Sequence, residues 1–508
     1  MPSTFDRANA NEDDCKRLLD DDASMHADTT TRGAARETGT SARSAESFDV
    51  ERSSGDAKPR ARFSTLRLIG LNMFFLAYGA WISSFAVVTL PYESTAFFPE
   101  TDAVALGGFM VIAGASQMSG PLAGYLSDRM RHAHGRRRPL IVKSASVVGP
   151  CLVALLAART YRDDLGDVGG TLAPVMYYVA FAITMIGLNV MYTAATGLVP
   201  DLVPDEQMGE ANGVLAACSA AGACLSFMWT MLWPDVGNLY FFYIGLLVTC
   251  VPITCYCAVE ESTLGTGEES ESDAYGEAAS VSWRELASMY TISPNKPEQR
   301  SFFWLFVCRT LYYTGISAQV FLQYLLRDTA IKDTGERLSG REPQQVVAKI
   351  SFIGQIGGML FAYPAGLLSD VVGRKPLIVL ACIGIISVYI SFIYVHKLST
   401  ILYLSAYYGA VNGMFLSVDY ALAIDCLPSR ENAARWLAIW GVASFIGTSI
   451  GPTVYSLILH FSPDADKSSD YGSSQDGYTK MLLVGSGWMI MCVAFLYKVD
   501  QNWRATLR

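Results

Sequence analysis

Long apolar runs, separated by short polar segments, make up most of the chain after residue 62. A helix needs about 20 apolar residues to cross the hydrocarbon core of a bilayer. Because backbone groups cannot stay unpaired in lipid, and because the sequence lacks the alternating pattern of barrel strands, each run is expected to be helical. Twelve runs reach this length, beginning near Ser64, Val104, Leu140, Pro174, Asn212, Tyr240, Ser301, Ala348, Leu377, Thr400, Ala434 and Met481. The pattern predicts an all-α integral membrane fold.

Composition and charge support this fold class. Hydrophobic residues make up 51% of the 508 residues and charged residues only 17%, as in integral membrane proteins. The net charge of −9 argues against nucleic-acid binding. Of the eleven cysteines, only Cys15 lies away from the predicted helices, so no extracellular disulfide framework is expected. The five histidines show no ligand spacing, and no catalytic arrangement is readable, so we expect neither a metal, a cofactor nor an enzyme.

A basic motif occurs twice, each time where one apolar run ends and the next begins. The first copy reads Gly-Tyr-Leu-Ser-Asp-Arg from Gly124 to Arg129 and leads to Gly-Arg-Arg-Arg-Pro at 135–139. The second, shorter copy extends from Gly366 to Pro376. Matching motifs in two halves indicate a duplicated six-helix unit. The expected organisation is therefore two bundles, 63–259 and 301–500, joined by an acidic linker, 260–300, with tails at 1–62 and 501–508.

The segments outside the bundles are polar. Residues 1–62 contain no apolar core of the kind that a cleaved signal requires, so we expect a disordered tail.

Most basic residues next to the apolar runs, including those of both motif copies, fall on one side of a twelve-helix count, whereas residues 88–104 contain no Lys or Arg. Basic residues are enriched in cytoplasmic loops, which places both termini in the cytoplasm.

The doubled motif resembles the signature of the major facilitator superfamily, and the resemblance covers nearly all of the chain after the tail. The stretch from Tyr78-Gly79-Ala80-Trp81 to Leu90-Pro91-Tyr92, followed by the motif at 127–139, resembles the sucrose carriers and their glycoside-pentoside-hexuronide relatives. These relatives are commonly proton-coupled sugar symporters. The chain departs from them between Val175 and Val199, which carries no acidic or basic side chain where the plant carriers are expected to use one.

The resemblance implies that the motif acts as a gate, stabilising an outward-facing state. Small glycines allow close helix approach, acids can address a neighbouring helix end, and arginines can pair with the acids. Alternatively, the arginines only follow the positive-inside rule and contact anionic lipid. The candidate gating residues are Gly124, Asp128, Arg129, Gly135, Arg136, Gly366, Asp370 and Arg374.

A second internal repeat adds two acids to this set. Asp201 and Asp425 occupy equivalent places in matching Pro-containing segments that follow the runs from Pro174 and Thr400. An acid is stabilised beside the positive N-terminal end of the next helix. The two acids are therefore either gating residues or simple helix caps.

Ionisable residues inside a membrane are costly and become functional candidates. Arg309 and Asp419 lie at similar depths, about 12 Å from the cytoplasmic side for Arg309 at about 1.5 Å per residue. The resemblance places their helices around a central cavity, so the two side chains could face each other. We interpret them as a proton-coupling pair, in which protonation of Asp419 frees Arg309; a permanent structural ion pair is the alternative.

Aromatic and amide side chains in the predicted cavity helices suit a neutral polar solute. Such side chains also anchor helices at membrane interfaces or join helices together. The candidate substrate residues are Tyr78, Trp81, Gln117, Asn189, Tyr192, Tyr312, Tyr313, Gln355, Asn412 and Trp440.

The sequence thus favours a secondary carrier of a small polar solute, first of all a proton-coupled sugar symporter acting as a monomer. An exporter or facilitator of another organic solute, or a non-transporting sensor with the same fold, remains the alternative. In the tail, Asp14, Leu18 and Leu19 resemble an acidic dileucine signal that sorting adaptors read. Both the plasma membrane and an endolysosomal or vacuolar membrane are therefore open as locations.

Overall fold

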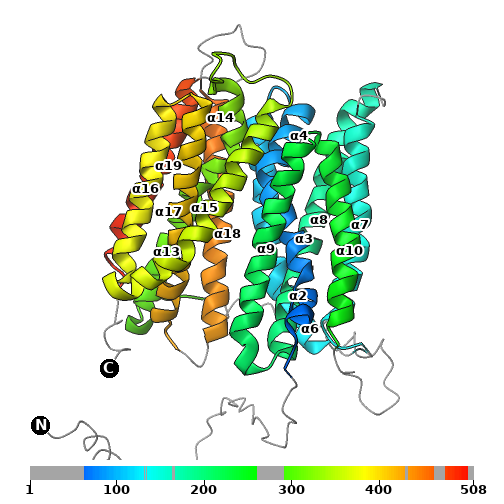
Figure 1. Cartoon of the computed structure of the whole chain (residues 1–508), viewed down its shortest axis with the longest axis vertical. Helices are drawn as coiled ribbons and strands as arrows, with labels where there is room; N and C mark the ends of the chain where they lie inside the picture. The colour runs from blue at the N-terminus through cyan, green and yellow to red at the C-terminus, as the bar shows by residue number, and fades with distance from the viewer. Residues whose placement is uncertain are drawn as a thin grey trace, which may run out of the picture. The chain divides into compact units, whose positions relative to one another are not determined.

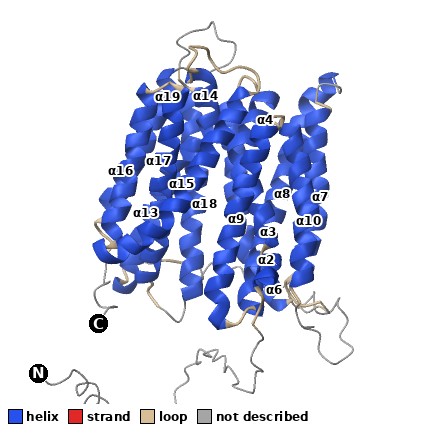
Figure 2. Ribbon diagram, in the orientation of Figure 1, coloured by secondary structure: helices blue, strands red, loops and turns tan. Residues whose placement is uncertain are grey.

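The computed structural model describes residues 62–130, 132, 134–162, 166–259, 291–429, 433–462 and 475–500. The chain divides into two units, Met1–Lys58 and Pro59–Arg508, and all described residues belong to the second. Helices make up most of this unit, and its described residues form no β-sheet (Figure 2). The sorting motif at Asp14, Leu18 and Leu19, residues 260–290 of the acidic linker and residues 501–508 lie outside the described part of the chain.

The described residues of the first half form six helical paths. The first path runs through α2 (Thr65–Leu71), α3 (Met73–Ser84), the π-helical turn η1 (Phe85–Thr89) and α4 (Leu90–Phe97). The second consists of α5 (Asp102–Ser116) and α6 (Ser119–Arg129). The other four are single helices: α7 (Arg138–Thr160), α8 (Gly166–Leu202), α9 (Met208–Leu232) and α10 (Val236–Cys257). The short turn η2 (Asp205–Gln207) lies between α8 and α9.

The second half repeats this arrangement. Its first path comprises α13 (Pro297–Ile316), the 3₁₀ turn η3 (Ser317–Phe321) and α14 (Leu322–Thr329). Five helices follow: α15 (Glu342–Val372), α16 (Arg374–Tyr394), α17 (Leu398–Asp425), α18 (Ala433–His460) and α19 (Gln475–Leu496). Figure 1 shows the blue-to-green helices of the first half beside the green-to-red helices of the second.

The predicted fold class, all-α with two six-helix bundles, is confirmed. Eleven of the described helical paths are long and apolar enough to cross a membrane. The remaining path, predicted from Ser301, is α13–η3–α14, which is interrupted at η3 and contains Glu298, Arg300 and Arg309. The largest shift in a predicted start is that of the run expected near Pro174, where α8 begins at Gly166.

The first path of each half is broken at a corresponding place. In the first half, Pro91 has no N–H for the carbonyl of Val87, and the π-helical turn η1 lies at that point. In the second half, the Gly315 carbonyl accepts hydrogen bonds from the Tyr389 and Tyr455 hydroxyls at 2.9 and 3.2 Å. In a continuous α-helix this carbonyl would accept a hydrogen bond from the N–H four residues later. Because the two hydroxyls satisfy it instead, the chain can form the tighter turn η3 at this point.

Glycines let the first path of each half pack closely against the fifth. A Cβ at Gly222 of α9 would lie 1.9 Å from the Leu76 carbonyl oxygen of α3, and a Cβ at Gly79 would lie 2.1 Å from the Ser219 carbonyl oxygen. In the second half, Gly451 of α18 makes the equivalent approach to α13, with 2.4 Å to the Thr314 carbonyl oxygen. Backbone contact of this kind is the usual way that membrane helices associate.

Replacing Gly222 by leucine should therefore force α3 and α9 apart. We expect Gly222→Leu to destabilise the purified protein by about 1–3 kcal/mol, the usual cost of overpacking, seen as a lower Tm in detergent. The matched control is Gly213→Leu in the same helix, where an added Cβ meets no atom within 4 Å. Equal Tm values for the two variants would contradict the close packing of α3 on α9.

Candidate functional site

A cavity of about 830 Å³ lies between the two halves. Helices of both halves line it, including the two broken paths: Phe85, Ala86 and Val87 of η1 on one side and Ser317, Ala318 and Gln319 of η3 on the other. None of the described lining residues is Asp, Glu, Lys, Arg or His. The cavity therefore offers no charged side chain, and its volume is within the range of small-molecule sites, about 300–1,000 Å³.

The two halves contribute different surfaces to the cavity. The first half is mostly apolar there, with Phe181, Met185 and a row of small residues on α9, Ala216, Ala217 and Ala220. The second half is richer in uncharged polar groups, among them Ser317, Gln319, Gln355, Tyr408, Asn412 and Thr448. A ligand with one apolar and one hydrogen-bonding side would match both surfaces.

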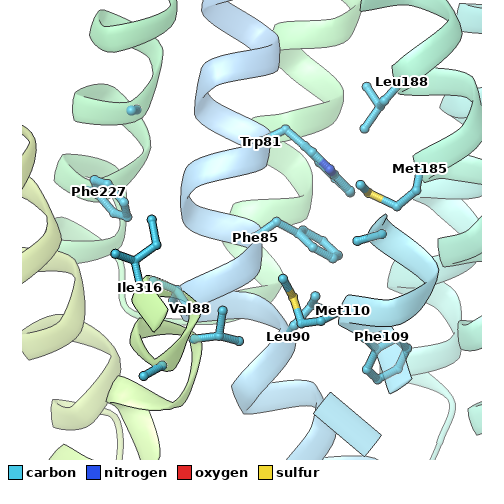
Figure 3. Close-up of a cluster of buried hydrophobic side chains, with 14 of the residues drawn as sticks. Trp81, Phe85, Val88, Leu90, Phe109, Met110, Met185, Leu188, Phe227 and Ile316 are labelled. Carbon is cyan, nitrogen blue, oxygen red and sulfur yellow. The ribbon is translucent and has the colours of Figure 1, made fainter. Parts of the chain in front are cut away.

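An aromatic cluster holds the first half's side of the cavity in place. The rings of Trp81 and Phe85 stack with centroids 4.0 Å apart, and Phe85 stacks on Phe181 at 5.7 Å. Figure 3 shows Trp81 and Phe85 on the same side of their helix, directed toward Met185. Behind them, the Tyr243 hydroxyl lies 2.6 Å from the Ser84 hydroxyl. The tryptophan is thus fixed by packing, although its indole N–H has no hydrogen-bond partner among the described residues.

Five of the ten candidate substrate residues line the cavity: Trp81, Gln117, Tyr313, Gln355 and Asn412. The amides of Gln117 and Gln355 form no hydrogen bond with protein groups in the described part of the chain. These two amides leave polar groups free on the cavity wall, whereas the indole N–H of Trp81 is buried behind it. Their role in substrate binding stays a prediction.

The other five candidates do not line the cavity. Tyr78 packs on Tyr192, with ring centroids 4.6 Å apart. Asn189 donates hydrogen bonds to the Ser116 hydroxyl and the Met185 carbonyl, each at 2.9 Å. Tyr312 lies behind Asn412 and donates to its side-chain oxygen at 2.9 Å, and Trp440 lies beside Arg309. These contacts pack the side chains together or join helices, which is the alternative to substrate binding that the sequence left open.

Sequence reasoning missed several lining residues. The Tyr408 hydroxyl donates to the side-chain oxygen of Gln319 at 3.0 Å, and both residues face the cavity. Tyr408 lies four residues before Asn412, so helical periodicity on α17 could have identified it. Ser317 and Gln319 belong to η3, and the break that exposes them depends on tyrosines from α16 and α18.

Arg309 of α13 and Asp419 of α17 form a buried ion pair. Arg309 also lies 3.3 Å above the Trp440 ring and donates a hydrogen bond to the Tyr313 hydroxyl at 3.4 Å. Its Nε has no partner among the described residues. Because Tyr313 lines the cavity, the ion pair is one side chain away from it. The sequence-based expectation that the two charges could face each other agrees with this geometry, while their role in coupling stays a prediction.

The motif copies lie at one end of the bundles, where α6 leads to α7 and α15 leads to α16; we call it the motif end, and the opposite end the far end (Figure 1). Asp201 accepts hydrogen bonds from Arg136 at 2.6 and 3.1 Å and from Arg137 at 2.9 Å. In the second copy, Arg374 pairs with Asp425 at 3.2 Å and with Asp370 at 2.6 Å. The two motif copies thus make matching ion pairs.

These motif-end ion pairs lie within one half each, so they brace the halves rather than join them. Gly124 faces Thr193 and Gly366 faces Ser417, each at the same place in its half. Gly135 and Gly373 adopt left-handed backbone, with φ of 85° and 101°, which favours glycine at both turns. The side chains of Asp128 and Arg129 lie outside the described part of the chain, so the gating hypothesis for them stays a prediction.

Polar contacts between described residues of the two halves lie at the far end. The Tyr324 hydroxyl donates to the Pro91 carbonyl at 3.1 Å, and Arg327 lies 3.5 Å from Asp102. Nearby, Arg341 lies 3.6 Å from Asp235, and Gln345 donates to the Met231 carbonyl at 3.3 Å. These contacts join the two halves at the far end.

Helices of the two halves also pack closely against each other on the far-end side. The Cβ positions of Gly107 and Gly114, both on α5, lie against Ser456 and Ser449 of α18. Because α5 is the far-end part of its path and α6 the motif-end part, this close packing is on the far-end side of the bundles.

Comparison with known proteins identifies the family. A family model described as Major Facilitator Superfamily matches residues 30–227 and 300–502. No curated protein matches the sequence. The nucleoside transporter NupG is similar in structure, with 13% identity, 86% of this chain and 100% of the other covered, and a TM-score of 0.61.

Two further solved structures have the same fold. A peptide transporter POT in complex with alafosfalin shares 12% identity over 87% of this chain and 96% of its own, with a TM-score of 0.60. A bacterial homologue of the human lysosomal transporter Spinster shares 13% identity over 87% of this chain and 97% of its own, with a TM-score of 0.58. Identities this low show a common fold and leave the substrate open.

The buried ion pair can be tested by a double-mutant cycle. Asp419→Leu leaves the buried Arg309 charge without its carboxylate, and Arg309→Met leaves the buried Asp419 charge without its guanidinium. Each variant should therefore destabilise the protein by about 3–5 kcal/mol. The double variant removes both charges and should recover most of that loss. Thermal unfolding in detergent measures all three; strictly additive effects would show that the two residues do not stabilise each other.

Proposed function

Because the chain belongs to the major facilitator superfamily, we propose that it carries a small neutral polar organic solute across a membrane by alternating access. The family and the solved structures with this fold are transporters, so the chain is a multi-pass membrane transporter and not an enzyme, as predicted. The observation that carries the solute class is the uncharged cavity, with the free amides of Gln117 and Gln355 on its wall.

A sugar or sugar-like molecule is the solute that we propose first. Aromatic faces together with amide donors suit a ring that is apolar on its faces and hydroxylated at its edge, and Trp81, Gln117 and Gln355 supply this combination. The resemblance to the sucrose carriers supports the same choice. A charged solute would enter a site without a charged lining residue in the described part of the chain, at a large desolvation cost.

Proton coupling is proposed through Asp419. While Asp419 is ionised, it holds Arg309, and Arg309 holds the Tyr313 hydroxyl at the cavity wall. Protonation of Asp419 removes the attraction and lets Arg309 and Tyr313 rearrange toward the solute. The proton gradient would then be the driving force, with no cofactor.

We further propose that the motif end faces the cytoplasm, because its basic residues satisfy the positive-inside rule. With the far end closed by the contacts of Tyr324, Arg327 and Arg341, the arrangement corresponds to an inward-facing state. The tail motif at Asp14, Leu18 and Leu19 supports an endolysosomal or vacuolar location as an alternative to the plasma membrane, and we expect a monomer.

Transport is tested by uptake of a labelled sugar panel into proteoliposomes, with and without an imposed pH gradient. We expect accumulation that needs the gradient in the native chain and only equilibration, without accumulation, in Asp419→Asn. Accumulation by Asp419→Asn as high as in the native chain would exclude this residue from coupling. Absence of flux for every sugar would redirect the search to other neutral solutes on the same fold.

The cavity amides are tested with the solute so identified. Gln117→Met and Gln355→Met each remove hydrogen bonds to the solute and keep the side-chain length. We expect KM to rise about 2- to 10-fold, the usual net worth of a hydrogen bond, with little change in Tm. The control is Gln475→Met at the exposed start of α19, away from the cavity. Unchanged KM for both cavity variants would show that these amides do not bind the solute.

A further inference from the structure

Glu93 of α4 is a buried carboxylate that the proposed coupling pair does not use. Its side chain is 0% exposed, and its Oε1 accepts a hydrogen bond from Arg159 at 2.5 Å. Its second oxygen, Oε2, has no hydrogen-bond partner among the described residues. A buried carboxylate with only one oxygen satisfied is costly, because desolvation is not fully offset. Such a group gains by binding a proton when its surroundings change.

The surroundings of Glu93 come from three packed helices. Arg159 is on α7, with Arg162 just after it, Tyr177 is on α8, and Asp235 and Tyr240 belong to α10 and its N-cap. The hydroxyls of Tyr177 and Tyr240 lie 2.6 Å apart and bond to each other. Arg159 is therefore the cation that directly bonds Glu93, and it also bonds Asp235.

The shared arginine connects Glu93 to the far end. Arg159 also donates a hydrogen bond to Asp235 at 3.2 Å, and Asp235 lies 3.6 Å from Arg341, which precedes α15 in the other half. Charges of alternating sign thus extend from the buried Glu93 through Arg159 and Asp235 to Arg341. The side chains of Asp235 and Arg341 are 35% and 61% exposed, so the ion pair between them contributes little stability by itself. Its strength therefore depends on how strongly Arg159 binds Asp235.

We propose that Glu93 is a proton-binding site, separate from the Asp419–Arg309 pair, whose protonation loosens the Asp235–Arg341 bridge at the far end. A proton on the free oxygen of Glu93 removes its charge and weakens its hold on Arg159. Arg159 then pairs more fully with Asp235, and Arg341 is released from it. This inference rests on the proposed alternating-access function, because it assigns Glu93 to opening of the end that the present arrangement closes.

The test measures opening of the far end directly. The full chain in nanodiscs carries spin labels at Glu100→Cys and Thr334→Cys, two exposed far-end positions in opposite halves, and pulsed EPR gives the distances between them. Neither substrate nor gradient is present. The parent without the two introduced cysteines corrects for labelling of native thiols.

We expect the ratio of open to closed far ends to rise about 2- to 5-fold from pH 8 to pH 5, the range set by loss of one exposed ion pair. Glu93→Gln should show the raised ratio at both pH values, and Asp419→Asn should keep the native pH response. A native chain without a pH response, or a Glu93→Gln variant that keeps it, would overturn the proposal.

A second variant keeps the test independent of folding at the buried site. Arg341→Gln removes the exposed member of the chain of charges and leaves Glu93 and Arg159 in place. It should raise the open-to-closed ratio at pH 8 to the native value at pH 5 and abolish the further rise. An unchanged ratio in Arg341→Gln would show that this bridge does not close the far end. Because the measurement uses no solute, its result is separable from the uptake results for Asp419→Asn.

Discussion

The absence of water from the hydrocarbon core is the constraint on which the rest of this structure depends. It makes each apolar run a helix, because only a helix satisfies its own backbone. It also requires every buried charge to find a partner, which Arg309 finds in Asp419 and Glu93 finds in Arg159. Polar groups left without protein partners, such as the amides of Gln117 and Gln355, are tolerated where a cavity lies between the halves. The same constraint therefore separates structural polar groups from candidate binding groups.

The contacts within each half differ in kind from those between the halves. Within a half, Gly222 and Gly451 bring helix backbones into direct contact, an arrangement that tolerates little displacement. At the far end, by contrast, the halves are joined partly by side chains, including the largely buried pair Arg327–Asp102 and the more exposed pair Arg341–Asp235. Exposed ion pairs contribute about 0–1 kcal/mol each. The helices within each half are thus held firmly together, while an exposed far-end contact such as Arg341–Asp235 can exchange at modest cost.

Most of the fold could be predicted from the sequence, because hydrophobic length alone identifies helices in a membrane. The pairing of Arg309 with Asp419 was also accessible, since both depths could be counted along helices that the resemblance placed around one cavity. Ser317 and Gln319 could not be found in this way. They reach the cavity through the turn η3, and that turn depends on hydroxyls of Tyr389 and Tyr455 from distant segments.

Glu93 was missed for a different reason. A run of about 20 residues from Ser64 ends before it, whereas the helical path continues through η1 and α4 to Phe97. Its partner Arg159 lies 66 positions away, and no sequence pattern links the two. Hydrophobic length therefore does not fix where a membrane helix ends, and buried charges near such an end cannot be recognised from it.

The environment of Arg309 explains how one buried cation can be both stable and able to respond. If Asp419 were its single partner, protonation of that carboxyl would leave the guanidinium isolated at a prohibitive cost. The Trp440 ring, 3.3 Å from the guanidinium, and the Tyr313 hydroxyl remain when the carboxylate is neutral. A desolvated cation–π contact contributes about 2 kcal/mol, which lowers the difference between the paired and released states. Since Tyr313 also lines the cavity, a change at Asp419 reaches the binding surface through a single side chain.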